Sequence, residues 1–211
     1  SYTNEGDEDL VMAGLSMISA EAAKDQDPAN LIFKHALSRV KFSFTNKFED
    51  TQIKVKVENV KLNKRNGENA TATITAGTTT GNVNASTIAW TIPSAGTTDL
   101  EFDFDGVEGD GDAIAINGVE TTDYQYIIPN ATAEYTMAAD ITVYTDAATI
   151  HTYKITGAKV VATGNSFNFE YGKSYTFNMN VTDDLNEITF TVSVEDWKDG
   201  VGGDINFDTT K

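Results

Sequence analysis

Residues 99–112 read DLEFDFDGVEGDGD and hold seven carboxylates, the densest group of chemically capable side chains in this chain. Carboxylate oxygens are the ligands that calcium prefers. The calcium-binding candidates are Asp103, Asp105, Asp110 and Asp112. Their spacing does not fit an EF-hand loop, because the fifth position from Asp103 is Val107 and the twelfth is not a glutamate. We therefore expect a solvated acidic strand and loop, and no metal or other cofactor.

Catalytic side chains are few. The sequence has two histidines and no cysteine, and it contains no G-x-S-x-G, H-E-x-x-H or glycine-rich phosphate-binding motif. His35 stands between Phe33 and Leu37 on an apolar face, which predicts a buried, satisfied and non-catalytic histidine. Paired carboxylates for glycoside hydrolysis could come only from the acidic run, whose sequence adjacency gives no cleft. The sequence therefore predicts that the protein is not an enzyme.

Charge is distributed unevenly along the 211 residues, whose formal net charge is −17. Residues 34–65 hold nine Lys and Arg against three acids, whereas residues 66–153 hold thirteen acids and neither Lys nor Arg. Such a chain is a poor partner for nucleic acid. The basic segment is interpreted either as a solvated sheet face or as a patch for an acidic neighbour.

Residues 31–46 and 52–63 alternate between apolar and polar side chains, as β-strands do. In each segment the alternation changes phase once, near residues 38–39 and near residues 58–59, which predicts one extra residue at each place. The two segments are predicted to fold as a bent hairpin. Its register sets these residues side by side: Phe44 and Ile53, Phe42 and Val55, Val40 and Val57 and, on the outer face, Arg39 and Glu58.

The rest of the chain repeats the same kind of pattern. A turn at Asn66-Gly67 is predicted to join residues 60–65 to residues 69–75, and Trp90 is predicted to lie in the core. Hairpins are predicted for residues 141–155 and 175–194. The predicted fold class is all-β: a large antiparallel β-sandwich of transthyretin-like or Greek-key type with long bent hairpins.

Three parts are predicted along the chain: an extended lead-in at 1–28, the sandwich at 29–198, and a tail at 199–211. An alternative is a division into two domains near residue 122. The tail reads DGVGGDINFDTTK, with Ile205 and Phe207 two residues apart after a glycine-rich stretch. This spacing fits an edge strand of the same domain, or a donor strand that adds to a neighbouring subunit through backbone hydrogen bonds and apolar anchors.

Five segments, in order, resemble the fimbrillin-like proteins of Bacteroides-type bacteria. They are DLVMAG (9–14), FKHALSRVKF (33–42), YQYIIPN (124–130), GKSYTFNMNV (172–181) and ITFTVSVEDW (188–197). The resemblance implies a non-enzymatic structural or adhesive subunit of a fimbria or cell-surface assembly. It also implies assembly with other fimbrial subunits by strand addition, contact with host or bacterial surface ligands, and an extracellular or outer-membrane location.

A different class of function stays open from the residues alone, namely a carbohydrate- or calcium-binding cell-surface module built around residues 99–112. An exposed Trp90 or Trp197 beside a cleft would favour this module, because sugars bind on aromatic rings. Two buried tryptophans would favour a structural subunit.

Overall fold

The computed structural model describes residues 6–13, 33–63, 70–75, 87–91, 99–105, 111–129, 135–160, 169–182 and 190–197. Within these ranges the chain forms strands and no helix, so no described segment is a helix able to cross a membrane. The strands are β1 (Val11–Ala13), β2 (Phe33–His35), β3 (Ser38–Asn46), β4 (Lys54–Leu62), β5 (Thr71–Thr75), β6 (Thr87–Thr91), β7 (Leu100–Glu101), β8 (Val119–Thr121), β9 (Gln125–Ile127), β10 (Thr136–Thr145), β11 (Ala148–Lys159), β12 (Lys173–Val181) and β13 (Phe190–Asp196). The predicted all-β class is confirmed.

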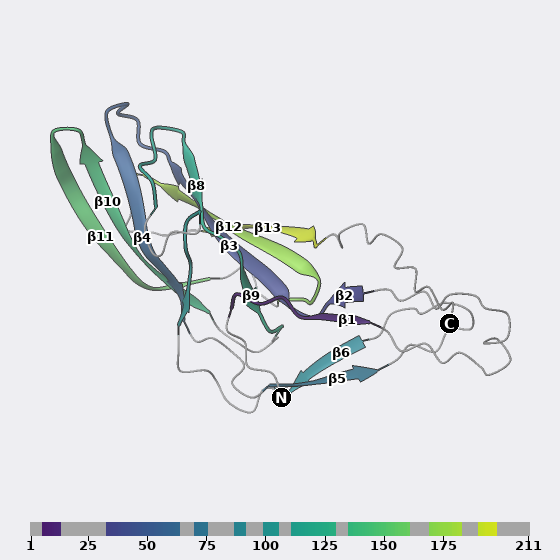
Figure 1. The fold of residues 1–211 in the computed structure, drawn as a ribbon. Helices are drawn as coiled ribbons and strands as arrows, with labels where there is room; N and C mark the ends of the chain where they lie inside the picture. The colour runs from purple at the N-terminus through teal and green to yellow at the C-terminus, as the bar shows by residue number, and fades with distance from the viewer. Residues whose placement is uncertain are drawn as a thin grey trace, which may run out of the picture.

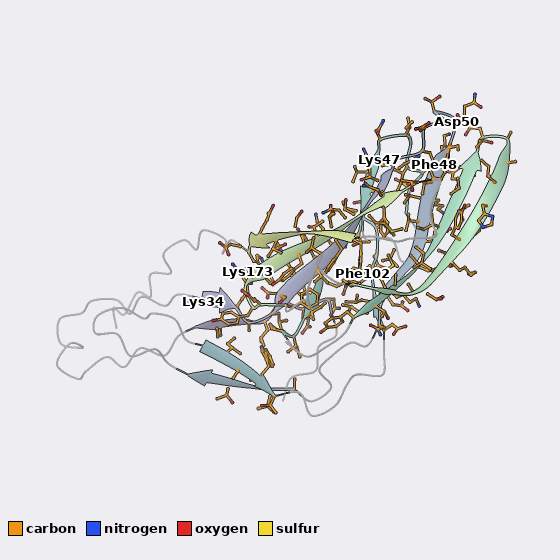
Figure 2. All side chains as sticks on the ribbon, turned by 180° about the vertical axis from the view of Figure 1, so that it is seen from behind. Lys34, Lys47, Phe48, Asp50, Phe102 and Lys173 are labelled. Atoms are coloured by element: carbon orange, nitrogen blue, oxygen red, sulfur yellow. The ribbon has the colours of Figure 1, made fainter. Side chains whose placement is uncertain are left out.

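Two main sheets form the body of the fold (Figure 1). One has the order β11-β10-β4-β7, and the other has the order β13-β12-β3-β8 with β9 also paired to β3. Apolar side chains from both sheets form one buried cluster, which includes Phe42, Val55, Phe102, Ile141 and Phe177. Phe102 lies deep in the body of the fold in Figure 2. This cluster uses residues from both sides of position 122.

The predicted bent hairpin of β3 and β4 is wrong, because the two strands belong to different sheets. β3 is hydrogen-bonded to β12, β8 and β9, and β4 is hydrogen-bonded to β10 and β7. The apolar faces of β3 and β4 do meet, but through contacts between the layers, so the alternation identified the buried faces and not the hydrogen-bonded partners.

Asn46 explains why the chain crosses between the layers after β3. Its carboxamide is fully buried. The side-chain nitrogen donates to the carbonyls of Ile53 (3.0 Å) and Ile114 (2.9 Å), and the side-chain oxygen accepts from the amide of Phe48 (3.1 Å). Phe48 is itself buried. These hydrogen bonds hold the connection from β3 to β4 as an arch that passes from one sheet to the other, and not as a tight hairpin turn.

Both predicted phase changes mark real irregularities. The first lies just before the predicted place: Ser38 and Arg39 pair regularly in β3, and the chain bends instead at residues 36–37, between β2 and β3, where it changes sheet. The second is a bulge at Asn59, whose φ is 53°, where the register of β4 on β10 shifts between Ala138 and Asp140. β11 bulges on the other side of β10 at Gly157, whose φ is 74°. The bend predicted for β4 is therefore shared with β10 and β11, not with β3.

The closing hairpin was predicted in its observed register. Tyr175 lies opposite Val194, Phe177 opposite Val192 and Met179 opposite Phe190 in the β12–β13 pair. The β10–β11 hairpin is likewise confirmed. The centre of the sheet differs from the purely antiparallel expectation, because β12 and β3 run parallel with Phe177 beside Phe42.

A smaller apolar cluster lies beside the main one. Leu37, Ala70 and Ile128 are buried in it, and Leu10, Trp90 and Tyr126 pack against it. β5 pairs with β6, so the predicted pairing of residues 69–75 with 60–65 is wrong. Leu62 of β4 already has a strand partner on each side, Leu100 of β7 and Met137 of β10.

Candidate functional site at the base of the C-terminal tail

Six half-buried side chains form what we call the aromatic–basic ladder on the outer face of the β13-β12-β3-β9 side of the sheet. They are His35, Arg39, Lys41, Tyr124, Tyr126 and Trp197. They come from β2, from β3, from β9 and the residue before it, and from the residue after β13. The ladder ends at Trp197, two residues before the predicted tail (199–211), so it is the part of the described structure nearest in sequence to the proposed donor segment.

Trp197 is held by two ring stacks. Its indole lies 3.5 Å from the His35 ring at an interplanar angle of 7°, and 5.5 Å from the Tyr126 ring at 19°. The Arg39 guanidinium lies 4.8 Å from the centroid of the same indole. Aromatic pairs and cation–π contacts each contribute roughly 0.5–1.5 kcal/mol, so these contacts together fix the end of β13.

Arg39 connects this stack to the middle of the sheet. Its guanidinium also lies 4.2 Å from the Tyr124 ring, and its Nε donates to the Ser174 hydroxyl at 3.2 Å. Lys41 lies 4.7 Å from the Tyr124 ring.

The prediction that Arg39 lies beside Glu58 is therefore wrong, because these two residues are in different sheets. The signal missed in the sequence was the two-residue spacing of Arg39 with Lys41 and of Tyr124 with Tyr126, which places each pair on one face.

Backbone hydrogen bonds tie the same point to the turn before β12 and to the bend between β2 and β3. The amide of Trp197 donates to the carbonyl of Gly172 (2.9 Å), and the amide of Gly172 donates to the carbonyl of Leu37 (2.9 Å). Gly172 has a φ of 68°, in the left-handed region that favours glycine. The base of the tail is thus anchored by main chain as well as by side chains.

The two tyrosines of the ladder have opposite electrostatic surroundings. Burial alone would raise the pKa of Tyr124, but its hydrogen bond with Ser174 and the charges of Lys41 and Arg39 outweigh it and lower that pKa. Burial, followed by the charge of Asp9, raises the pKa of Tyr126. Tyr124 therefore faces the basic part of the ladder and Tyr126 its acidic border.

His35 is half-buried, with 12 % of its side chain exposed, rather than part of the main core. Its Nδ1 lies 2.8 Å from a carboxylate oxygen of Asp9, and its ring stacks on Trp197. Trp90 is also half-buried, and its indole nitrogen donates to the carbonyl of Ala36 at 3.2 Å. The ring stacks of Trp197 occupy ring surface that a bound sugar would need, and Trp90 packs against the smaller apolar cluster.

The other site residues proposed from the sequence lie partly outside the described ranges. Ile205, Phe207 and Asp110 lie outside the described residues. Leu100, Phe102 and Phe104 point into the core, as the alternation predicted. Within the described parts of the chain, no group of three or more His, Asp or Glu side chains could hold a metal ion.

The oppositely charged segments meet within the molecule. Lys54 pairs with Asp146 (2.5 Å), Lys61 with Glu101 (2.6 Å) and Lys154 with Asp140 (3.1 Å). Each pair joins the basic strand β4, or Lys154 of β11, to an acid from residues 66–153. The part of the basic segment that holds Lys54 and Lys61 is therefore a solvated, internally paired sheet face, as in the first of its two interpretations.

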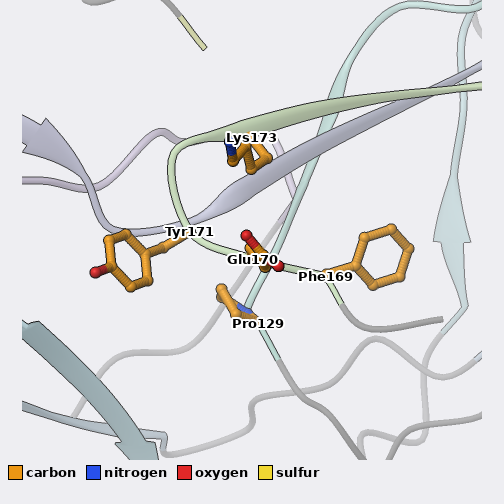
Figure 3. A pocket seen from close by; sticks show the side chains of 5 residues that line it. All are labelled: Pro129, Phe169, Glu170, Tyr171 and Lys173. Atoms are coloured by element: carbon orange, nitrogen blue, oxygen red, sulfur yellow. The ribbon is translucent and has the colours of Figure 1, made fainter. Parts of the chain in front are cut away.

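A pocket of about 490 Å³ lies beside the anchored turn. It is lined by Pro129, Phe169, Glu170, Tyr171 and Lys173 (Figure 3). Phe169 and Tyr171 point to opposite sides of their segment in Figure 3, and Phe169 is buried whereas Tyr171 is exposed. This lining combines two aromatic rings and a proline with one carboxylate and one ammonium group.

Replacing Trp197 with alanine is expected to loosen the base of the tail. The substitution removes both ring stacks and one cation–π contact, so we expect stability to fall by about 1.5–4.5 kcal/mol and amide exchange in β13 to rise. Hydrogen–deuterium exchange of the peptide covering Phe190–Asp196 measures the local effect. Ile150→Ala, at an exposed position, is the control. Unchanged exchange in Trp197→Ala would show that the ladder does not hold this end.

Comparison with known proteins gives a family model, described as fimbrillin-like, that matches residues 1–197. No curated protein matches the chain. A fimbrial protein from Bacteroides vulgatus is similar in structure at 16 % identity and a TM-score of 0.47, over 80 % of this chain and 56 % of that one. A tip fimbrial protein from Porphyromonas gingivalis with a C-terminal truncation aligns at 8 % identity and a TM-score of 0.37, over 78 % and 52 % of the two chains. This chain thus spans little more than half of either structure.

Proposed function

Because this chain belongs to the fimbrillin-like family, we propose that it is a non-enzymatic structural or adhesive subunit of a bacterial fimbria or cell-surface assembly, joined to other subunits by β-strand addition. The family match over residues 1–197 is the observation that carries this proposal. In this proposal the protein acts at the extracellular or outer-membrane surface. Its partners are other fimbrial subunits and surface ligands of the host or of other bacteria.

The tail is the proposed donor strand. Trp197 is fixed by the aromatic–basic ladder and by Gly172, so the 198–211 segment starts from a defined point at the end of β13. Ile205 and Phe207 are spaced to place two anchors on one face of an added strand. Backbone hydrogen bonds to an edge strand of the neighbouring subunit supply affinity, and the two apolar anchors determine where the tail binds. Two anchors are few, so pairing between isolated subunits is expected to be weak and reversible.

Deletion of residues 201–211 is expected to abolish incorporation into fimbriae while leaving the folded domain intact. The segment lies beyond the anchored Trp197, so its removal leaves every described strand in place. Incorporation is measured by immunoblotting of purified fimbriae, and folding by thermal melting of the monomer. Normal incorporation of the shortened chain, or a large fall in its melting temperature, would contradict the donor role. The second result would identify the tail as an edge strand of its own domain.

A pair of full-length variants removes the ambiguity of a deletion. Ile205→Ala with Phe207→Ala removes both anchors, whereas Thr209→Ala with Thr210→Ala changes the same tail outside them. We expect the first variant to lose incorporation and the second to keep it.

A further inference from the structure

β11 is a long edge strand whose outer side has no described neighbour. It spans Ala148–Lys159, and within the described strands it is hydrogen-bonded to β10 alone. Figure 1 shows it at the outer margin of its sheet, next to β10 and then β4. An edge strand presents a row of backbone donors and acceptors to any incoming strand. We propose that this edge of β11 receives the tail of a second copy of the chain, an inference that rests on the proposed function.

The core-facing side of β11 is apolar and incompletely covered. Tyr153 lies opposite Ile141 and Ile155 opposite Ala139, and both partners on β10 are buried core residues. Ile155 is buried, Tyr153 is half-buried against the core, and His151, on the same side, is exposed. A strand added outside β11 would continue this face. Apolar residues two apart on that strand would then extend the core beside Tyr153 and Ile155.

The tail has this pattern. With Ile205 and Phe207 turned toward the core beside Tyr153 and Ile155, Asn206 stands beside Lys154 on the outward side. Asp204 and Asp208 then also face outward, at the diagonal positions that a long lysine side chain reaches. The side chain of Lys154 is 73 % exposed, and its present partner is the single carboxylate of Asp140. The acidic tail would therefore offer the exposed Lys154 two further carboxylates besides that of Asp140.

The other edges of the two main sheets fit this tail less well, among the strands that the structure describes. β7, β8 and β9 have two or three residues each, too few to pair with a five-residue strand. β13 is longer, and Val194 on it is 50 % exposed, but Glu195 is exposed too, whereas Asp196 is paired with Lys173. Like charges would oppose an acidic tail there. β11 thus combines length, apolar continuity and positive charge.

Cysteine cross-linking tests the position of the tail, because the chain has no cysteine of its own. Full-length Thr152→Cys is mixed with full-length Asn206→Cys under mild oxidation, and the disulfide-linked heterodimer is measured over time. The matched control is Thr191→Cys, an exposed threonine on the edge strand β13. We expect the β11 pair to cross-link at least tenfold faster than the β13 pair. Equal rates, a faster β13 pair, or predominant Thr152→Cys homodimers would overturn the β11 assignment.

Exchanging the charges of Lys154 and of the tail aspartates tests whether their attraction directs the tail to β11. Lys154→Glu on the Thr152→Cys chain is expected to slow cross-linking at least fivefold, and Asp204→Lys with Asp208→Lys on the Asn206→Cys chain is expected to restore it. Absence of slowing, or of rescue, would contradict the role given to Lys154. Circular dichroism checks that each variant is folded.

The two proposals fail in different ways. If the 201–211 deletion abolishes incorporation but the tail does not cross-link to β11, the donor role stands and the acceptor edge is wrong. If the deletion leaves incorporation unchanged, the donor role is wrong, and the β11 proposal falls with it.

Discussion

Phe42→Ala is expected to lower the free energy of unfolding by about 3–5 kcal/mol, the range for removing a fully buried phenylalanine. The Phe42 side chain is 0 % exposed at the centre of the core. Its ring lies 5.0 Å from Phe102 in an edge-to-face arrangement, 5.5 Å from Phe177 and 6.3 Å from Phe44. Truncation therefore leaves a cavity where side chains of both sheets meet, which rigid neighbours fill only in part.

Denaturant unfolding followed by far-UV circular dichroism measures this change. Val119→Ala is the control, because Val119 belongs to the same sheet but is 56 % exposed, and its replacement should change stability by no more than about 0.5 kcal/mol. We expect one cooperative transition that moves as a whole in Phe42→Ala, since Phe102 and Phe177 come from opposite sides of residue 122. A loss below about 1 kcal/mol, or the shift of only one of two transitions, would be inconsistent with a single shared core.

Asn46→Leu is expected to cost about 2–4 kcal/mol even though leucine has a similar volume and is apolar. The substitution removes the hydrogen bonds that the carboxamide makes with the Phe48 amide and with the carbonyls of Ile53 and Ile114. The Ile114 carbonyl still accepts a hydrogen bond from the Val55 amide, so the groups that lose their partner are mainly the Phe48 amide and the Ile53 carbonyl. A buried polar group left without a partner costs roughly 1–3 kcal/mol. Wild-type stability in Asn46→Leu would show that the arch does not depend on this side chain.

Asn46→Asp keeps the shape of the side chain but replaces its amide donor with a carboxyl oxygen, so it separates the effect of hydrogen bonding from that of shape. The introduced carboxyl would face two carbonyl oxygens away from water, so its pKa in the folded protein should lie above the unfolded value of about 3.9. A group with a raised folded pKa loses stability as the pH rises through that pKa. The stability of Asn46→Asp relative to Asn46→Leu should therefore fall from about pH 4 to about pH 7, by roughly 1.4 kcal/mol for each unit of pKa shift. A pH-independent difference would mean that the carboxyl reaches solvent.

The strongest local patterns in the sequence predicted their elements well. Alternation in β4, β12 and residues 99–105 identified the buried residues, because side chains on a strand alternate between faces whatever the strand is paired with. The turn of the β10–β11 hairpin and the register of β12 on β13 also followed from local pattern, since the strands are adjacent in sequence. The bulge at Asn59 was visible as a change of phase.

The candidate site was harder to predict. Trp197 was singled out through the family resemblance, but its neighbours His35, Arg39 and Tyr126 come from distant parts of the chain. The alternation placed Arg39 on an outer face and His35 on an apolar one, and it could not say which faces adjoin. The edge proposed for tail binding depends in the same way on β10 having β4 and β11 as its two neighbours.

The sequence by itself determined the all-β class, the buried face of each clear strand and the family, because each depends on local alternation or on short segments in order. Only the tertiary structure decided that β3 and β4 lie in opposite sheets and that β12 runs parallel to β3. The physical reason is that alternation sets the direction of a side chain but not the partner of a backbone amide. A chain leaving β3 could meet β4 either along a hydrogen-bonded edge or across the core, and the buried carboxamide of Asn46 stabilises the second path.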